Sequence, residues 1–211
     1  MQLRRVDDQL SLEAASPADA QALAAVLQAS GDWLDVVPGM NSVVVRFDAA
    51  AIDAGEAERR VVELLADGVP CVHDSPQLVE IPVVYGGAYG PDLESLSEAT
   101  GLSTDEIVAL HTGREYRVDM VGFTPGFAFI GGLDDRLRVP RREEPRQRVE
   151  PGSVGIADGR TGLYAMASPG GWTLIGRTPC RLFDAAADEP FVLRPGMRVR
   201  FAAISADEFE A

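Results

Sequence analysis

The second half of the chain lacks helical periodicity, and this feature most limits the folds available to it. After Gly113, short β-rich runs are separated by turn residues. The dipeptide Asp158-Gly159, for example, separates residues 154–156 from residues 163–165, which is typical of a β-hairpin. The last run, residues 197–201, alternates apolar and charged side chains. We therefore predict a compact β-barrel or closed sandwich for the C-terminal portion.

The first 85 residues have a different pattern, in which strand-like and helix-like segments alternate. Ser16 is a good N-cap and Pro17 a good first helical residue. The expected elements are a strand at 10–12, a helix at 16–31, strands at 33–37 and 42–47, a helix at 55–66 and a strand at 78–85. This β-α-β-β-α-β order is the split βαβ pattern of ferredoxin-like domains. The sequence thus predicts an α+β fold with a ferredoxin-like domain over 1–85 and a barrel domain over 86–211.

Three local signals refine this prediction. Two short helices should follow the domain boundary, at 91–100 and 104–111. Ser103 and Glu106 are spaced as a capping box at the start of the second. Pro82 cannot donate to a β-ladder, so the strand at 78–85 should lie at an edge or carry a bulge.

The net charge and the cysteine content limit which classes of binding partner and which cellular compartment we expect. The 211-residue chain has a net charge of −14, so nucleic-acid phosphates and anionic membrane surfaces should repel it. Cys71 and Cys180 are the only cysteines, and no charged-then-apolar leader opens the chain. No apolar run approaches the roughly 20 residues that span a bilayer. We expect a cytoplasmic protein that binds neither nucleic acid nor membrane.

The basic residues exclude several chemistries. All 19 of them are arginine, so the chain has no Walker lysine, no Schiff-base lysine and no biotinyl-lysine. Its two histidines, His73 and His111, are too few for a histidine-rich site, and we expect no metal. His73 is assigned no role. His111 lies one turn from the end of its predicted helix, where it either interacts with the helix dipole or acts as a general acid or base facing a cleft.

A stiff turn is predicted at residues 122–127. Pro125 fixes its own φ, and Gly126 can adopt the positive φ of a type II turn. The backbone would then hold the rings of Phe123 and Phe127 in place. These rings either line a ligand site or pack as core residues.

An arginine-rich segment follows this turn. Residues 136–148 contain six arginines, of which Arg141 and Arg146 each follow a proline. Such charge runs are usually solvated surface. Alternatively, Arg141 and Arg146 offer planar bidentate donors to a carboxylate or phosphate, which would suit a small anionic substrate.

Two glycine-rich segments complete the candidate site. Ser153 lies in the segment Gly-Ser-Val-Gly, which does not match the Gly-x-Ser-x-Gly motif of a nucleophile elbow. The simpler interpretation is that Ser153 is a hydrogen-bonding strand residue. Gly170 and Gly171 either form an anion-binding backbone nest or let the chain turn a barrel corner. In the second case Trp172 packs as an anchor of the core or of an interface.

Four blocks in order resemble the family of the 5-oxoprolinase B subunit, also known as the kinase A inhibitor family and as allophanate hydrolase subunit 1. This family is homologous to part of the urea carboxylase carboxyltransferase domain. The blocks are residues 122–127, the Pro-Arg-x-x-x-Pro-Arg of 140–146, residues 152–156, and residues 168–172 with 175–178. The chain departs from the family pattern at Phe129-Ile130, where Tyr-Leu is common, and at its N-terminal strand, which lacks the usual Gly-Asp-x-Ala-Leu opening.

The resemblance implies an α+β domain followed by a cyclophilin-like barrel, in a subunit of a heteromeric, ATP-dependent amidohydrolase that converts 5-oxoproline to glutamate. It also implies a second, C-type subunit of related barrel fold and, for the oxoprolinase members, a third, A-type subunit. On this hypothesis His111 protonates the lactam nitrogen, Arg141 and Arg146 hold a carboxylate or phosphate, and the glycine loops stabilise oxyanion charge. The rival functions are a regulator that inhibits a sensor histidine kinase and the carboxyltransferase part of a urea carboxylase or allophanate hydrolase system.

Overall fold

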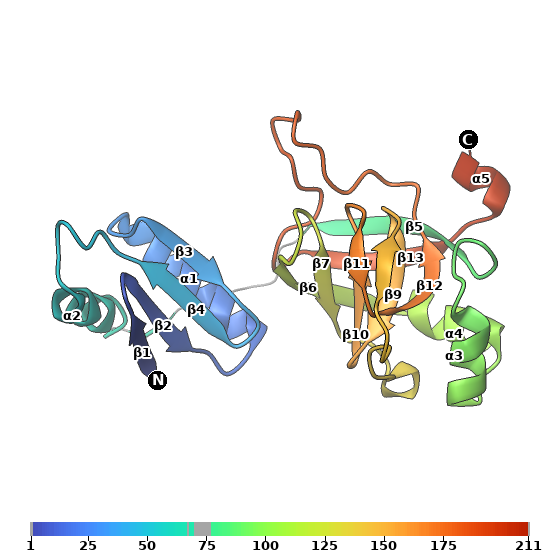
Figure 1. Cartoon of the computed structure of the whole chain (residues 1–211), viewed down its shortest axis with the longest axis horizontal. Helices are drawn as coiled ribbons and strands as arrows, with labels where there is room; N and C mark the ends of the chain where they lie inside the picture. The colour runs from blue at the N-terminus through green and yellow to red at the C-terminus, as the bar shows by residue number, and fades with distance from the viewer. Residues whose placement is uncertain (1, 67, 70–76, 211) are drawn as a thin grey trace. The chain divides into compact units, whose positions relative to one another are not determined.

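The computed structural model describes residues 2–66, 68–69 and 77–210. The chain divides into two compact units, Met1–Asp74 and Ser75–Ala211. Figure 1 shows the elements of each unit. Within the described ranges, no helix is long and apolar enough to cross a membrane.

The first unit is a four-stranded antiparallel sheet with two helices. Its elements are β1 (Leu3–Val6), β2 (Gln9–Glu13), α1 (Pro17–Ser30), β3 (Asp35–Pro38), β4 (Ser42–Arg46) and α2 (Ala54–Leu64), and the strand order is β1-β2-β4-β3. Helix α1 begins as predicted, because the Ser16 side chain accepts a hydrogen bond from the Asp19 amide. Leu10, Leu12 and Leu27 are fully buried in the core of this unit.

The predicted ferredoxin-like pattern is not confirmed for this unit. The strand predicted at 78–85 is β5 (Leu78–Tyr85), which pairs inside the barrel and belongs to the second unit. The boundary between the units therefore lies before β5 and not after residue 85. The first strand, β1, was missed in the sequence because Arg4, Arg5 and Val6 are all exposed and give no alternation.

The second unit contains a closed seven-stranded barrel, which confirms the predicted barrel. The strands run in the order β10-β7-β6-β13-β5-β12-β9 around it, and β13 and β5 are parallel. Besides β5 they are β6 (Glu115–Val121), β7 (Ala128–Gly131), β9 (Ser153–Ala157), β10 (Arg160–Leu163), β12 (Thr173–Arg177) and β13 (Arg198–Ala203). Pro82 is accommodated because β12 pairs with β5 only at Val84 and Tyr85.

Short elements surround the barrel (Figure 1). They are α3 (Leu93–Thr100), α4 (Thr104–Thr112), the 3-10 turn η1 (Asp135–Leu137), α5 (Ala206–Glu210), and a two-stranded ribbon of β8 (Arg146–Val149) and β11 (Ser168–Gly170). The predicted capping box of α4 is present, since Ser103 and Glu106 each bond the other's backbone amide.

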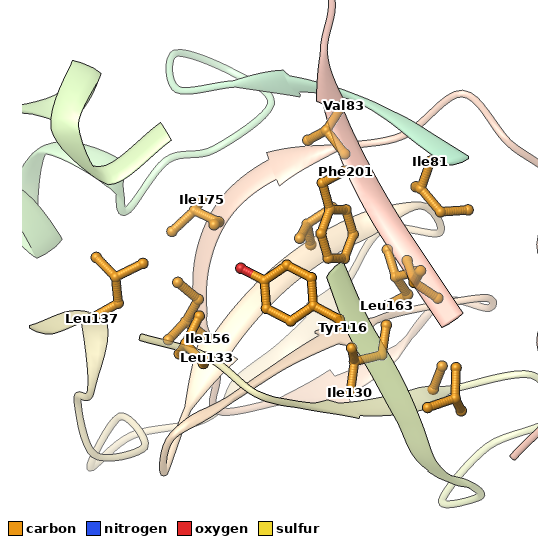
Figure 2. Close-up of a cluster of buried hydrophobic side chains, with 14 of the residues drawn as sticks. Ile81, Val83, Tyr116, Ile130, Leu133, Leu137, Ile156, Leu163, Ile175 and Phe201 are labelled. Atoms are coloured by element: carbon orange, nitrogen blue, oxygen red, sulfur yellow. The ribbon is translucent and has the colours of Figure 1, made fainter. Parts of the chain in front are cut away.

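Strand alternation gives the barrel two different faces. Val154 and Ile156 of β9 and Leu163 of β10 belong to the main buried core. Because side chains alternate along a strand, Gly155 and Gly162 lie on the opposite, outer face of the barrel. The two glycines are directly paired across β9 and β10. Figure 2 shows the main core, in which the rings of Tyr116 and Phe201 lie 5.4 Å apart.

Truncation of Phe201 tests this core. Phe201 is 1% exposed, so Phe201→Ala should reduce the free energy of unfolding by about 3–5 kcal/mol. Phe191 is 38% exposed, and Phe191→Ala should cost no more than about 1 kcal/mol. Urea unfolding of both variants measures the difference, and equal costs would contradict the described core.

Candidate functional site

A small pocket lies where the predicted turn, the arginine segment and the second glycine loop meet. Its volume is about 90 Å3. The lining residues are Phe123, Phe127, Phe129, Arg141, Tyr164, Gly170, Gly171 and Trp172. Six of the ten residues that the sequence suggested for substrate binding are therefore together. The other four, Pro125, Gly126, Arg146 and Ser153, do not line the pocket.

The turn beside the pocket has the predicted type II form. The Phe127 amide donates to the Thr124 carbonyl over 3.1 Å, and Gly126 has a φ of 77°. A Cβ on Gly126 would also come within 2.8 Å of the Ala165 Cβ and 2.9 Å of the Phe183 Cβ. Pro125 and Gly126 thus shape the loop and do not contact the pocket.

Phe123 is held in a strained conformation at the pocket. Its φ is 73°, although this left-handed region costs a residue with a side chain about 1–2 kcal/mol. Its side chain is 67% exposed, so burial of the ring does not offset the strain. Strain of this kind in an exposed aromatic residue points to a functional role for the ring.

Aromatic rings form the wall of the pocket. The Phe127 ring centroid lies 4.6 Å from that of Phe129, 4.8 Å from Tyr164 and 5.6 Å from Trp172, all edge to face. Trp172 packs over the paired glycines on the outer face of the barrel. A Cβ on Gly155 would come within 2.9 Å of the Trp172 Cβ.

Arg141 supplies the positive charge of the pocket. Its Nε donates to Asp158 over 3.2 Å, and its Cζ lies 6.0 Å from the centroid of the Trp172 ring. The side chain is 60% exposed. The Asp158 contact uses Nε alone, so the two Nη groups of Arg141 can donate to a ligand.

Tyr164 serves the pocket as a neutral phenol. Burial raises the pKa of Tyr164 to about 12, although a backbone hydrogen bond at Trp172 and the charges of Arg141 and Arg146 lower it. At neutral pH this hydroxyl keeps its proton and is not a general base.

Arg146 binds a carboxylate of the protein itself and does not line the pocket, so the structure does not support its predicted role as a substrate ligand. Its Nη2 donates to Asp92 over 2.7 Å. Its Nη1 is buried and has no hydrogen-bond partner within the described ranges. Asp92 was missed in the sequence because an aspartate after Pro91 at a helix start resembles an ordinary N-cap.

Ser153 is a buried strand residue, as the simpler interpretation held. It is 4% exposed and pairs with Arg177 across β9 and β12. Its carbonyl accepts a hydrogen bond from the Tyr164 amide over 3.0 Å. Ser153 therefore fixes the strand behind the pocket and is not positioned for catalysis.

His111 is buried and does not face a cleft, which corrects its predicted catalytic position. It is 0% exposed, with Nδ1 2.7 Å from the Tyr85 hydroxyl and Nε2 2.9 Å from Thr161 Oγ1. Thr161 in turn donates to the Gly155 carbonyl over 3.2 Å. These bonds are all satisfied by the neutral ring with its proton on Nε2. Burial lowers the pKa of His111 to about 3, so the imidazole is neutral at neutral pH and does not act as a general acid.

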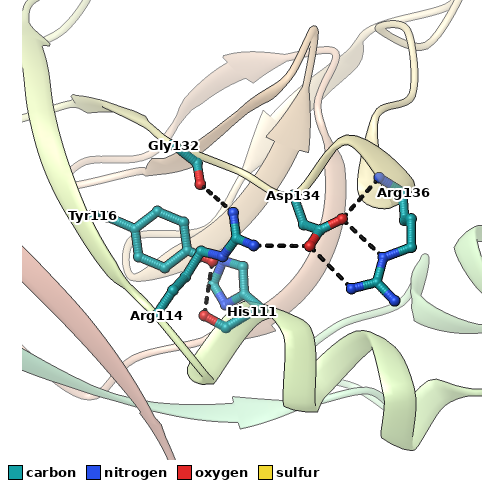
Figure 3. A network of polar contacts seen from close by, with 6 residues as sticks. All are labelled: His111, Arg114, Tyr116, Gly132, Asp134 and Arg136. Atoms are coloured by element: carbon teal, nitrogen blue, oxygen red, sulfur yellow. Dashed lines mark hydrogen bonds and ion pairs between the residues drawn. The ribbon is translucent and has the colours of Figure 1, made fainter.

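A separate polar network holds the η1 turn. Asp134 accepts hydrogen bonds from the guanidinium groups of Arg114 and Arg136, and Arg114 also donates to the Gly132 carbonyl (Figure 3). The bonds from Arg136 lower the pKa of Asp134 to about 2. None of these residues lines the pocket, so the network is structural.

His73 lies outside the described residues. Within the described part of the chain, no group of His, Cys, Asp and Glu could hold a metal ion.

Comparisons with known proteins agree on one family. Residues 4–193 match the family model for the carboxyltransferase domain, subdomains C and D. The chain is 46% identical over 171 residues to the B subunit of 5-oxoprolinase from Escherichia coli O157:H7, a match that covers 80% of this chain and 77% of that protein.

Two solved structures share the fold. The protein TTHA0988 superimposes with a TM-score of 0.81 at 33% identity, over 97% of this chain and 41% of its own. This chain thus spans less than half the length of TTHA0988. The urea carboxylase of Kluyveromyces lactis superimposes with a TM-score of 0.78 over 99% of this chain and 22% of its own. Its 17% identity shows a common fold alone.

Substitutions at Phe123 test the strain. Glycine relieves a positive φ and alanine does not, so Phe123→Gly should be more stable than Phe123→Ala by about 1 kcal/mol. Urea unfolding measures the two values. At Phe191, whose φ is not positive, the glycine variant should be the less stable one. The same order at both positions would contradict the strain at Phe123.

The pH dependence of stability tests the buried state of His111. The folded pKa of about 3 is below the ordinary 6.5, so the unfolded chain binds more protons between these values. The free energy of unfolding should be constant above pH 6.5 and should fall by up to about 1.4 kcal/mol for each pH unit below it.

The variant His111→Gln should be less stable at pH 7 but should lose this slope between pH 6.5 and 5. His73→Gln is the matched control, since it leaves the Tyr85–His111–Thr161 bonds intact. Equal slopes in wild type and His111→Gln would contradict a buried neutral imidazole.

Proposed function

This chain belongs to the carboxyltransferase-domain family that includes the 5-oxoprolinase B subunits, and on that premise we propose that it is a component of a 5-oxoprolinase. In this proposal the chain works in a heteromeric, ATP-dependent amidohydrolase that opens the lactam of 5-oxoproline to give glutamate. The chain binds the substrate, and a second subunit of related barrel fold completes the site. We propose a third subunit as a further member of this complex.

The composition of the pocket carries the proposal. A five-membered lactam with a carboxylate needs apolar contacts for its ring and a planar cation for its acid group. Phe127 and Trp172 supply the contacts, and the Arg141 guanidinium over the Trp172 ring supplies the cation. Gly170 has no Cβ, which leaves room for the Tyr164 phenol at the pocket.

The proposed dependence on a partner is supported by the small size of the pocket and by the groups that line it. Its volume of about 90 Å3 is below the roughly 300–1,000 Å3 of complete small-molecule sites. Of the lining residues, Tyr164 keeps its proton at neutral pH, because burial raises its pKa to about 12. We propose that the general acid and base come from another chain. The matching region of TTHA0988 is joined to additional chain, which in our proposal corresponds to the second subunit.

We propose that ATP binds to another member of the complex. The pocket volume of about 90 Å3 is far below that of a complete small-molecule site, and its lining, among the described residues, supplies a single cation, Arg141.

The rival function as a kinase regulator requires an exposed apolar patch and no polar cleft. The pocket combines an exposed aromatic residue, Phe123, with the partly solvated Arg141. This charged lining favours a small-molecule site over a protein-docking surface. The urea carboxylase rival is supported by the carboxyltransferase-domain family model and by a fold shared at 17% identity, whereas the relative at 46% identity is a 5-oxoprolinase B subunit.

Glutamate formation by the assembled complex tests the proposal. With Arg141→Gln, the KM for 5-oxoproline should rise about 10- to 100-fold and kcat should change little, because a hydrogen bond to a charged group contributes about 1.5–3 kcal/mol. Arg148→Gln is the matched control, since Arg148 is exposed and pairs with Glu150. Unchanged KM in Arg141→Gln, or full turnover without this chain, would refute the proposal.

A further inference from the structure

We propose that Asp92 is a positioning residue that fixes the geometry of the pocket through its hydrogen-bond partners. Asp92 does not line the pocket. Its carboxylate contacts Leu174, Arg146 and Arg142, and each of these residues is connected to residues that line the pocket. The inference concerns the shape of the pocket and does not depend on which ligand binds there. Its effect on KM rests on the proposed function.

The carboxylate of Asp92 is buried and used at both oxygens. Its side chain is 8% exposed. Oδ2 accepts a hydrogen bond from the Leu174 amide over 2.7 Å. Oδ1 accepts from Arg146 Nη2 over 2.7 Å and lies 3.4 Å from Arg142 Nη1. The Asp92 amide also donates to the Leu174 carbonyl over 2.9 Å, so Asp92 and Leu174 are joined twice.

The Asp92 carboxylate does not cap the helix at whose N-terminus it lies. Asp92 is the N-cap residue of α3, where an aspartate side chain usually accepts a hydrogen bond from the first turn. It makes no such bond. A lost cap costs about 1 kcal/mol, so the contacts with the barrel and the arginines must offset it. Helix capping therefore does not explain this aspartate.

Each partner of Asp92 is directly connected to the pocket. Leu174 is two residues from Trp172 on the same chain segment. Arg146 is paired with Gly170 across β8 and β11. The Arg142 amide donates to the Gly171 carbonyl over 2.7 Å, and Arg142 follows Arg141. A shift of the carboxylate would move Trp172, the two glycines and Arg141 together.

The charge of Asp92 is essential to this arrangement. Among the described residues Arg146 Nη1 has no partner, so the negative charge at Nη2 is what holds the guanidinium in a mostly buried position. An amide at position 92 can still accept the Leu174 bond, but it cannot neutralise Arg146. Asp92→Asn should therefore release the ribbon that carries Arg146 while it leaves the β12 contact in place.

The fluorescence of Trp172 reports the position of the pocket wall without any ligand. In a Trp33→Phe background Trp172 is the only tryptophan. Asp92→Asn should raise the acrylamide quenching constant of Trp172 at least twofold, because Trp172 is 6% exposed in the intact wall. Arg146→Met should do the same, and the double variant should match the single ones, since both act through one contact.

Asp134→Asn is the matched control. Asp134 also binds two arginines, but none of its partners lines the pocket (Figure 3). This variant should lower stability and leave Trp172 quenching unchanged. In the assembled complex Asp92→Asn should raise the KM for 5-oxoproline about tenfold with kcat within threefold, and Asp92→Glu should recover part of the loss.

Two results would overturn the inference. One is Trp172 quenching in folded Asp92→Asn and Arg146→Met that equals the wild-type value. The other is an equal change in Asp134→Asn, which would indicate general loosening. If the quenching result holds but the wild-type complex does not act on 5-oxoproline, the proposed function fails and the positioning role of Asp92 stands.

Discussion

The contact between Trp172 and a pair of glycines is the constraint on which the site depends. Gly155 and Gly162 are cross-strand partners on the outer face of the barrel, and together they leave a patch of bare backbone. A Cβ on Gly162 would come within 2.8 Å of Trp172 and 3.0 Å of Phe127. A side chain at Gly162 would therefore displace both rings, and one at Gly155 would displace Trp172. The pocket exists because the two strands that fill the barrel with Val154, Ile156 and Leu163 place glycines, Gly155 and Gly162, at paired positions of their opposite face.

The two buried polar clusters of this unit have different roles. His111 joins α4 to β5 and β10 in the main core, where its neutral ring bonds Tyr85 and Thr161. Asp92 joins the start of α3 to β12 and to the β8–β11 ribbon, next to the pocket. Each group is the type of residue that sequence inspection selects for catalysis. His111 does not contact the pocket. Asp92 acts on the pocket through its hydrogen-bond partners.

The sequence predicted those features that depend on neighbouring residues. The turn at Pro125-Gly126, the cap at Ser16, the capping box at Ser103 and the β-rich second half all follow from local chemistry. It could not assign β5 to the barrel, because that choice depends on pairing with β13, more than a hundred residues later. Arg146 was taken for a ligand-binding residue because its partner, Asp92, is 54 residues away. The roles of Gly155 and Gly162 become visible only when the strand register is known.

These observations lead to one account of the chain. A barrel with a bare glycine patch supports an aromatic wall, Asp92 fixes the segments that complete the wall, and Arg141 gives the pocket its charge. The most direct test is a crystal structure of the chain in complex with 5-oxoproline and its partner subunit. The account predicts the substrate ring against Trp172 and its carboxylate within hydrogen-bond distance of the Arg141 guanidinium. A substrate bound in the complex away from both residues would contradict it.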